Sequence, residues 1–144
     1  MAEGSESAEG FAATDYSEMD TKIKIHFLET LLARCQAAGK PTMSSAAVKR
    51  MDELYNLTAS KNAELRVRWQ RLCILHRCDF IVPHALQFVR EAGRMKFVRP
   101  LYRELGAWAE QRDKAVATFK EVRTGYHPIA EKMLAQDLKV DEKA

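Results

Sequence analysis

Residues 62–74 read NAELRVRWQRLCI and predict the fold class more clearly than any other segment. Apolar residues recur there at intervals of three and four, which is the period of an amphipathic α-helix. Asn62 is a suitable N-cap because its side-chain oxygen accepts hydrogen bonds from first-turn N–H groups. Glu64 is spaced for an i,i+4 ion pair with Arg68, and we expect Trp69 to anchor a core. The expected buried face comprises Leu65, Trp69, Leu72, Cys73 and His76.

The same helical period continues on both sides of this segment, and no useful length of chain alternates with the period of a β-strand. Breaks in the pattern divide the chain into seven expected helices. They cover residues 21–38, 45–56, 62–76, 79–91, 98–108, 113–122 and a short segment from residue 128. Because the connections are short, neighbouring helices must run antiparallel. The sequence therefore predicts an all-α fold, either a bundle or a stack of helix pairs.

Several helix ends carry recognisable signals. Asp79 and Asp113 are expected to cap the fourth and sixth helices. Gly93 stands where the fourth helix would end with a left-handed residue, and Pro100 where the fifth would be in its first turn. The expected inward-facing residues include Ile23, Leu86, Val116 and Ile129.

Composition and charge restrict the class of protein. The 144 residues are 47% hydrophobic and 30% charged, which is typical of one globular domain with a core. The net charge of +3 conceals an asymmetry, because residues 1–20 carry six acids and no base while residues 21–144 have a net charge of +9. A basic body permits an anionic partner without specifying one. Nucleic-acid binding is not expected, because no recognition helix or aromatic platform accompanies the basic residues.

The ends of the chain and its cysteines predict an intracellular protein. Residues 1–20 are rich in Gly, Ser, Ala and Glu, so we expect an acidic disordered tail before a helical domain over residues 21–141 and a short tail at 142–144. The tail resembles neither a signal peptide nor a mitochondrial presequence. No apolar run approaches the roughly 20 residues of a membrane span. Three cysteines in apolar helical patterns indicate reduced thiols in a cytoplasmic protein.

Residues 93–100, GRMKFVRP, form the strongest candidate binding segment. Arg94, Lys96 and Arg99 crowd around an expected helix N-terminus, where the helix dipole is positive and cations lose free energy. Free N–H groups beside such cations favour an anion, and Arg holds a carboxylate or phosphate with two parallel hydrogen bonds. The alternative is that these side chains form an ordinary solvated helix face.

Taken together, the segments 62–74 and 93–102, the pair His127-Pro128 and the ending 137–141 resemble a known family. They are similar to the C-terminal helical domain of leukotriene A-4 hydrolase and its aminopeptidase B relatives, which are zinc aminopeptidases. The resemblance covers roughly residues 21–141. It implies a double layer of antiparallel helices, an irregular armadillo- or HEAT-like solenoid of about seven helices.

The resemblance also implies a role and a partner. In the whole enzyme this domain walls one side of the active-site cleft of a thermolysin-like catalytic domain. The family's cations in the matching motif correspond to Arg94 and Lys96 here, which would bind the substrate carboxylate of a peptide or a fatty acid. No such role transfers to Arg99 or Arg103, which we interpret as surface or structural residues.

The catalytic machinery of the family is absent from this sequence. The zinc motif H-E-x-x-H does not occur, and the four histidines lie in four different segments. We therefore expect no catalytic residue, metal ligand or cofactor in this chain, with zinc belonging to the full-length enzyme, and no hydrolysis by the chain alone. Two functions remain open at this point: a domain of a zinc aminopeptidase, or a free-standing helical protein-interaction module.

Overall fold

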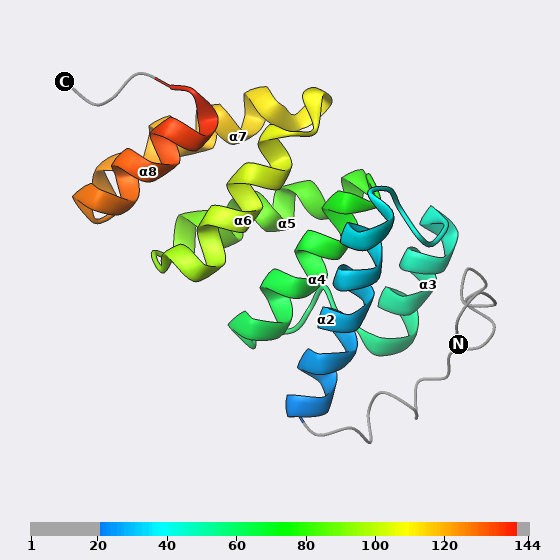
Figure 1. The fold of residues 1–144 in the computed structure, drawn as a ribbon. Helices are drawn as coiled ribbons and strands as arrows, with labels where there is room; N and C mark the ends of the chain where they lie inside the picture. Colours follow the sequence, from blue (N-terminus) through cyan, green and yellow to red (C-terminus); the bar gives the residue numbers. More distant parts are fainter. Residues whose placement is uncertain (1–20, 141–144) are drawn as a thin grey trace. The chain divides into compact units, whose positions relative to one another are not determined.

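The computed structural model describes residues 21–140, and it confirms the all-α fold (Figure 1). No strand occurs among these residues. The expected tails at 1–20 and 142–144 lie outside the described part of the chain. The α-helices are α2 (Thr21–Ala38), α3 (Ser45–Tyr55), α4 (Ala63–Leu75), α5 (Val82–Glu91), α6 (Met95–Gly106), α7 (Ala109–Val122) and α8 (Pro128–Leu138). Two 3₁₀ turns, η3 (Asp79–Ile81) and η4 (Arg123–Gly125), precede α5 and α8.

The chain divides between Ile81 and Val82 into two compact units, each with helices packed in layers. The first unit contains α2, α3 and α4, and α2 packs along α4. The second contains α5 to α8, and α6 packs against α5, α7 and α8. The helix that carries the candidate binding segment is therefore the central helix of the second unit.

Helix α4 forms the core of the first unit in the way its sequence predicts. Asn62 caps it, with its side-chain oxygen 2.9 Å from the Glu64 N–H. Trp69 is fully buried, and its indole N–H donates to the Thr58 hydroxyl at 2.9 Å. Arg68 pairs with Glu64 at 2.7 Å, as expected, and also with Glu29 of α2 at 2.7 Å. The charged face of α4 thus contributes to holding α2 in place.

A buried histidine connects the α2–α3 loop to the end of α4. The Nε2 atom of His76 lies 3.3 Å from the backbone N of Thr42 and 3.2 Å from that of Met43. Because Nε2 accepts from N–H groups, the ring proton is on Nδ1, which donates to the Leu72 carbonyl at 2.8 Å. Burial lowers the pKa of His76 from its ordinary value, opposed by the bond to Leu72. The neutral ring is therefore part of the folded structure.

The start of α6 differs from the sequence expectation. The helix begins at Met95 rather than near Val98, so Pro100 is its sixth residue and lies in the second turn instead of the first. Gly93 does not end α5 in the left-handed conformation; among the described residues a positive φ occurs at Gly39, Asn56, Arg77 and Lys139. The physical reason is burial: Phe97 and Val98 are both buried, so packing extends the helix back toward the loop.

Other helix ends and faces also differ from the expectation. Asp79 opens the turn η3 instead of capping α5, and Asp113 lies inside α7. Trp108 takes the cap position of α7 because its ring is buried there, with its N–H donating to Glu110 at 3.1 Å. Several residues expected to face inward are exposed or half-buried, because the buried faces of their helices run through neighbouring positions. Ile23 and Ile129 are 51% and 66% exposed. The half-buried ones are Phe27, Leu54, Tyr55, Leu86, Val116, Val122 and Met133.

We predict that His76 makes the stability of the chain fall on acidification. The unfolded chain binds a proton on this side chain near pH 6.5, whereas the folded state resists it, so the stabilisation is present above that pH and is lost as the pH falls toward the lower folded pKa. His76→Gln retains an acceptor without titrating, so urea unfolding of this variant should depend less on pH between 7 and 5. His76→Ala should cost roughly 2–4 kcal/mol, because two N–H groups lose their acceptor.

The matched control is His26→Gln, which changes an exposed histidine of the same unit. An equal pH dependence in wild type and His76→Gln would show that His76 is not the titrating group.

Candidate functional site: the N-terminus of α6

The two cations predicted to bind a carboxylate lie at the start of α6. Arg94 is the N-cap residue, with extended backbone angles of φ −78° and ψ 129°, and Lys96 follows two residues later. Both side chains are exposed. The Arg94 Cζ atom lies 5.4 Å and the Lys96 Nζ atom 5.3 Å from the centroid of the Phe97 ring. Phe97 therefore places both positive charges around one aromatic ring.

Phe97 is itself fixed by the neighbouring helix. It is buried, and its ring centroid lies 6.0 Å from that of Phe88 in α5. An exposed cation on a long flexible stem gains a defined position when that stem crosses a buried aromatic side chain. The site thus consists of two exposed cations beside a buried aromatic ring.

The first turn of α6 has an unusual electrostatic environment. Helices α3, α4 and α8 have N-cap side chains that accept hydrogen bonds, namely Ser44, Asn62 and His127. Arg94 cannot do this, because a guanidinium has donors and no acceptor, and α6 has no acidic residue in its first turn. The positive end of the helix dipole and the side-chain charges consequently have the same sign, which favours a bound anion.

Three arginines of this unit, Arg90, Arg99 and Arg123, pair with acidic side chains. Arg90 donates to both carboxylate oxygens of Glu121 at 3.2 Å. Arg99 donates to the two carboxylate oxygens of Asp137 at 2.7 and 3.2 Å. Arg103 is exposed in the last turn of α6. Within residues 21–140, no ion pair between Arg94 and an acidic side chain is found, and its guanidinium lies beside the Phe97 ring.

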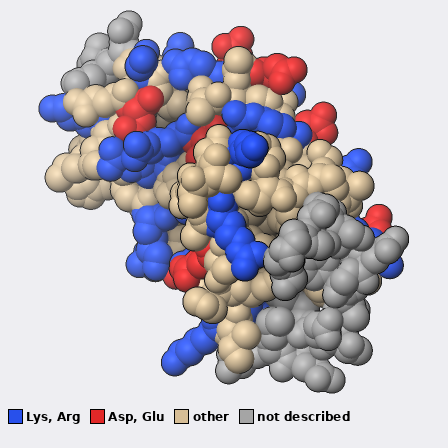
Figure 2. Space-filling view, turned by 45° about the vertical axis from the view of Figure 1, so that its right-hand side comes forward, with Lys and Arg blue, Asp and Glu red and all other residues tan. Residues whose placement is uncertain are grey.

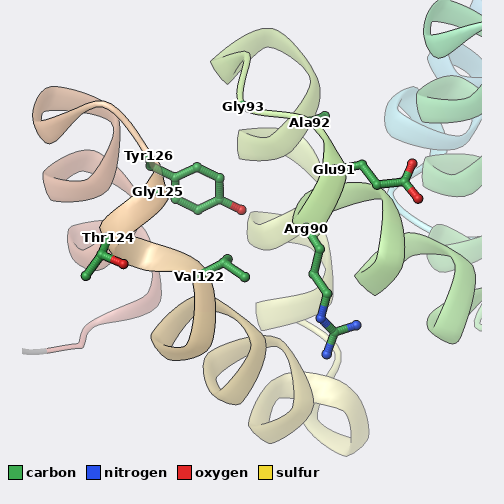
Figure 3. Close-up of a pocket in the computed structure, with 8 residues that line it drawn as sticks. All are labelled: Arg90, Glu91, Ala92, Gly93, Val122, Thr124, Gly125 and Tyr126. Carbon is green, nitrogen blue, oxygen red and sulfur yellow. The ribbon is translucent and has the colours of Figure 1, made fainter.

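A hollow of about 360 Å³ lies beside this segment, between the end of α5 and the turn η4 (Figure 3). Tyr126 points from η4 toward α5, and its hydroxyl donates to the Val89 carbonyl at 2.6 Å and lies 2.9 Å from the Tyr102 hydroxyl. Burial, with the contact to Tyr126, raises the pKa of Tyr102 well above its ordinary range. Glu91 points away from Tyr126. The hollow therefore does not bring together an acid, a base and a nucleophile.

The described residues include no group of three or more His, Cys, Asp and Glu side chains close enough to hold a metal ion. Cys35, Cys73 and Cys78 are buried, and no disulfide joins any of them. Burial raises the pKa of Cys73 and of Cys78, which favours the protonated thiol over the thiolate. His127 caps α8, with its Nδ1 accepting from the Ile129 N–H at 3.1 Å.

The surface chemistry follows the basic composition. Figure 2 shows Lys and Arg side chains spread across the visible face and interrupted by neutral and acidic residues. In residues 21–140, no helix combines the length and the apolar character that crossing a membrane requires. Positive charge is therefore spread over this visible face. What distinguishes the start of α6 is the placement of two cations around the Phe97 ring.

The described residues form an all-α domain in which Arg94 and Lys96 lie at the start of α6. The family model described as "Leukotriene A4 hydrolase, C-terminal" matches residues 19–138, and the chain belongs to this family. Leukotriene A-4 hydrolase of Xenopus laevis is 41% identical over 130 residues, covering 90% of this chain and 20% of that protein. Leucine aminopeptidase 2 of Yarrowia lipolytica is 32% identical over 135 residues, covering 91% and 20%.

Solved structures agree with the sequence comparison. The native yeast LTA4 hydrolase structure matches with a TM-score of 0.77 and 29% identity, over 92% of this chain and 22% of that one. The yeast enzyme in complex with bestatin matches with the same TM-score and 32% identity. The chain thus spans about a fifth of the length of these relatives, and the family resemblance seen in the sequence is confirmed.

We predict that Arg94→Asn stabilises the folded chain. Asn at this position supplies the missing acceptor for the first-turn N–H groups, which should raise the free energy of unfolding by about 0.5–1 kcal/mol in urea titrations. The control, Arg103→Asn, changes an exposed arginine near the other end of α6 and should give no gain. A lower free energy of unfolding in Arg94→Asn would mean that the missing N-cap acceptor does not limit the stability of α6.

Proposed function

We propose that this chain is the C-terminal domain of a zinc aminopeptidase of the leukotriene A-4 hydrolase type, and that Arg94 and Lys96 bind the carboxylate of its substrate. The observation that carries the proposal is the start of α6: a cap position without an acceptor, no acidic residue in the first turn, and two cations around the Phe97 ring. Family membership supplies the context, because its members include hydrolases and aminopeptidases.

The partner in this proposal is a thermolysin-like catalytic domain, in the same chain or a separate one. The relatives are about five times longer than the matched region, which leaves room for such a domain. This chain would wall one side of the active-site cleft, and the catalytic part would hold the zinc ion that activates water. The cytoplasm suits a domain whose three buried cysteines form no disulfide.

The two cations would act differently on a carboxylate. The planar guanidinium of Arg94 can hold both oxygens with parallel hydrogen bonds, whereas the Lys96 ammonium acts as a point charge. The positive end of the α6 dipole adds to both. The ligand is the C-terminal carboxylate of a short peptide or the carboxylate of a fatty acid. Binding the carboxylate at a fixed distance from the catalytic centre would also position the bond to be cleaved. The carboxylate site would therefore affect both turnover and substrate affinity.

We predict unequal effects of the two cations on peptide hydrolysis. In a complete aminopeptidase that contains this domain, Arg94→Ala should lower kcat/KM for a tripeptide with a free C-terminus by roughly 10–100-fold, the value of a charge-assisted hydrogen bond pair. Lys96→Ala should lower kcat/KM less, by about 5-fold. Arg94→Lys should recover only part of the loss seen in Arg94→Ala, because an ammonium cannot hold both carboxylate oxygens with parallel hydrogen bonds.

The tripeptide amide is the control substrate, because it has no carboxylate to bind. Its hydrolysis should be slow in the wild type and almost unaffected by either substitution. If Arg94→Ala and Lys96→Ala both leave the preference for the acid over the amide unchanged, the carboxylate assignment is wrong.

A further inference from the structure

We propose that Asp137 is a positioning residue for the carboxylate site and that it acts through Arg99. This inference rests on the proposed function of Arg94 and Lys96 and adds a residue from a different helix. Arg99 donates from Nε to one Asp137 oxygen at 2.7 Å and from Nη2 to the other at 3.2 Å. The fork joins the second turn of α6 to the last turn of α8.

The first turn of α6 has little internal support. Its cap residue, Arg94, provides no side-chain hydrogen bond. Pro100 has no N–H, so the helical bond that residue 100 would donate to the Lys96 carbonyl cannot form. The charges of Arg94 and Lys96 oppose the helix dipole. A turn of this kind frays unless contacts with other helices hold it.

Two such contacts are present on α6 next to the site. One is apolar, with Phe97 packed against Phe88 of α5. The other is the Arg99–Asp137 fork to α8, and Arg99 follows Lys96 by three residues, which places the two on adjoining parts of the helix surface. The Asp137 side chain is only 14% exposed and that of Arg99 34%, so this pair is better shielded from solvent than Arg90–Glu121, at 35% and 58%.

Asp137 stands on a helix that is fixed at both ends. Near its beginning, Glu131 of α8 accepts from Arg123 Nε at 2.7 Å, and both side chains are largely buried. At its end, Arg112 of α7 donates to the Leu138 carbonyl. Asp137 is therefore held in place by α7 and α8, and through Arg99 it fixes the start of α6, which carries the two cations. Phe97 keeps the first turn of α6 folded when the Arg99–Asp137 ion pair is broken.

The test compares Asp137→Asn with wild type in a complete aminopeptidase that contains this domain, using the tripeptide acid and the tripeptide amide. Asp137→Asn keeps the shape of the side chain and removes its charge. We expect kcat/KM for the acid to fall about 5- to 20-fold, with kcat lowered as well as KM raised, because the cations are displaced from the productive geometry. Hydrolysis of the amide should stay within twofold.

Two further variants separate positioning from general stability. Glu121→Gln breaks the Arg90–Glu121 pair in the same unit and should leave the preference for the acid unchanged. Arg99→Gln should reproduce Asp137→Asn, and the double variant should be no worse than either single one, since both remove the same interaction. Asp137→Glu, which keeps the carboxylate, should recover part of the preference.

Each failure points to a different conclusion. If Arg94→Ala abolishes the preference for the acid and Asp137→Asn behaves like Glu121→Gln, the positioning role is overturned while the carboxylate site stands. If Asp137→Asn lowers acid and amide hydrolysis equally, Asp137 is merely structural and the inference is again overturned. If Arg94→Ala itself retains the preference, the proposed function fails first.

Discussion

Burial of Phe97 and Val98 against neighbouring helices holds the first turn of α6 in place, and the candidate site depends on that packing. The turn carries cations at the positive end of a helix dipole and has no side-chain cap. Such an arrangement loses free energy locally, by about 0.3–1 kcal/mol for each exposed charge. Phe97 and Val98 in this turn are nevertheless buried, and Arg99 in the next turn pairs with Asp137 of α8. In the proposed site, a bound anion supplies the negative charge that this helix start lacks.

Polar contacts also hold the helices of the second unit together. Tyr126 satisfies the Val89 carbonyl and contacts Tyr102 within a buried aromatic cluster that includes Phe119. Ion pairs secure the two ends of α8, and the hydroxyl pair fixes η4 against α5 and α6. Each of these groups contributes to holding helices of the second unit together.

The helices themselves were largely predictable from local patterns. The period of apolar residues in 62–74, the Asn62 cap and the Glu64–Arg68 pair all appear as expected, because each depends on residues no more than one turn apart. Motifs carried the family resemblance, which the comparison confirmed. The boundaries were less predictable. Pro100 and Gly93 both suggested a later start for α6, and Asp113 suggested a cap, but burial of Phe97 and of Trp108 shifted those helix starts.

By itself the sequence determined the all-α class, the approximate helices, the placement of Arg94 and Lys96 near a helix start, and the family. Only the tertiary structure decided which arginines have acidic partners. Arg99 and Asp137 are 38 residues apart, and Arg90 and Glu121 are 31 apart, and no periodicity connects residues at such separations. The same holds for His76, whose partners Thr42 and Met43 lie more than 30 residues earlier. Local rules act within a few residues, whereas the pairing of side chains from different helices follows from how whole faces pack.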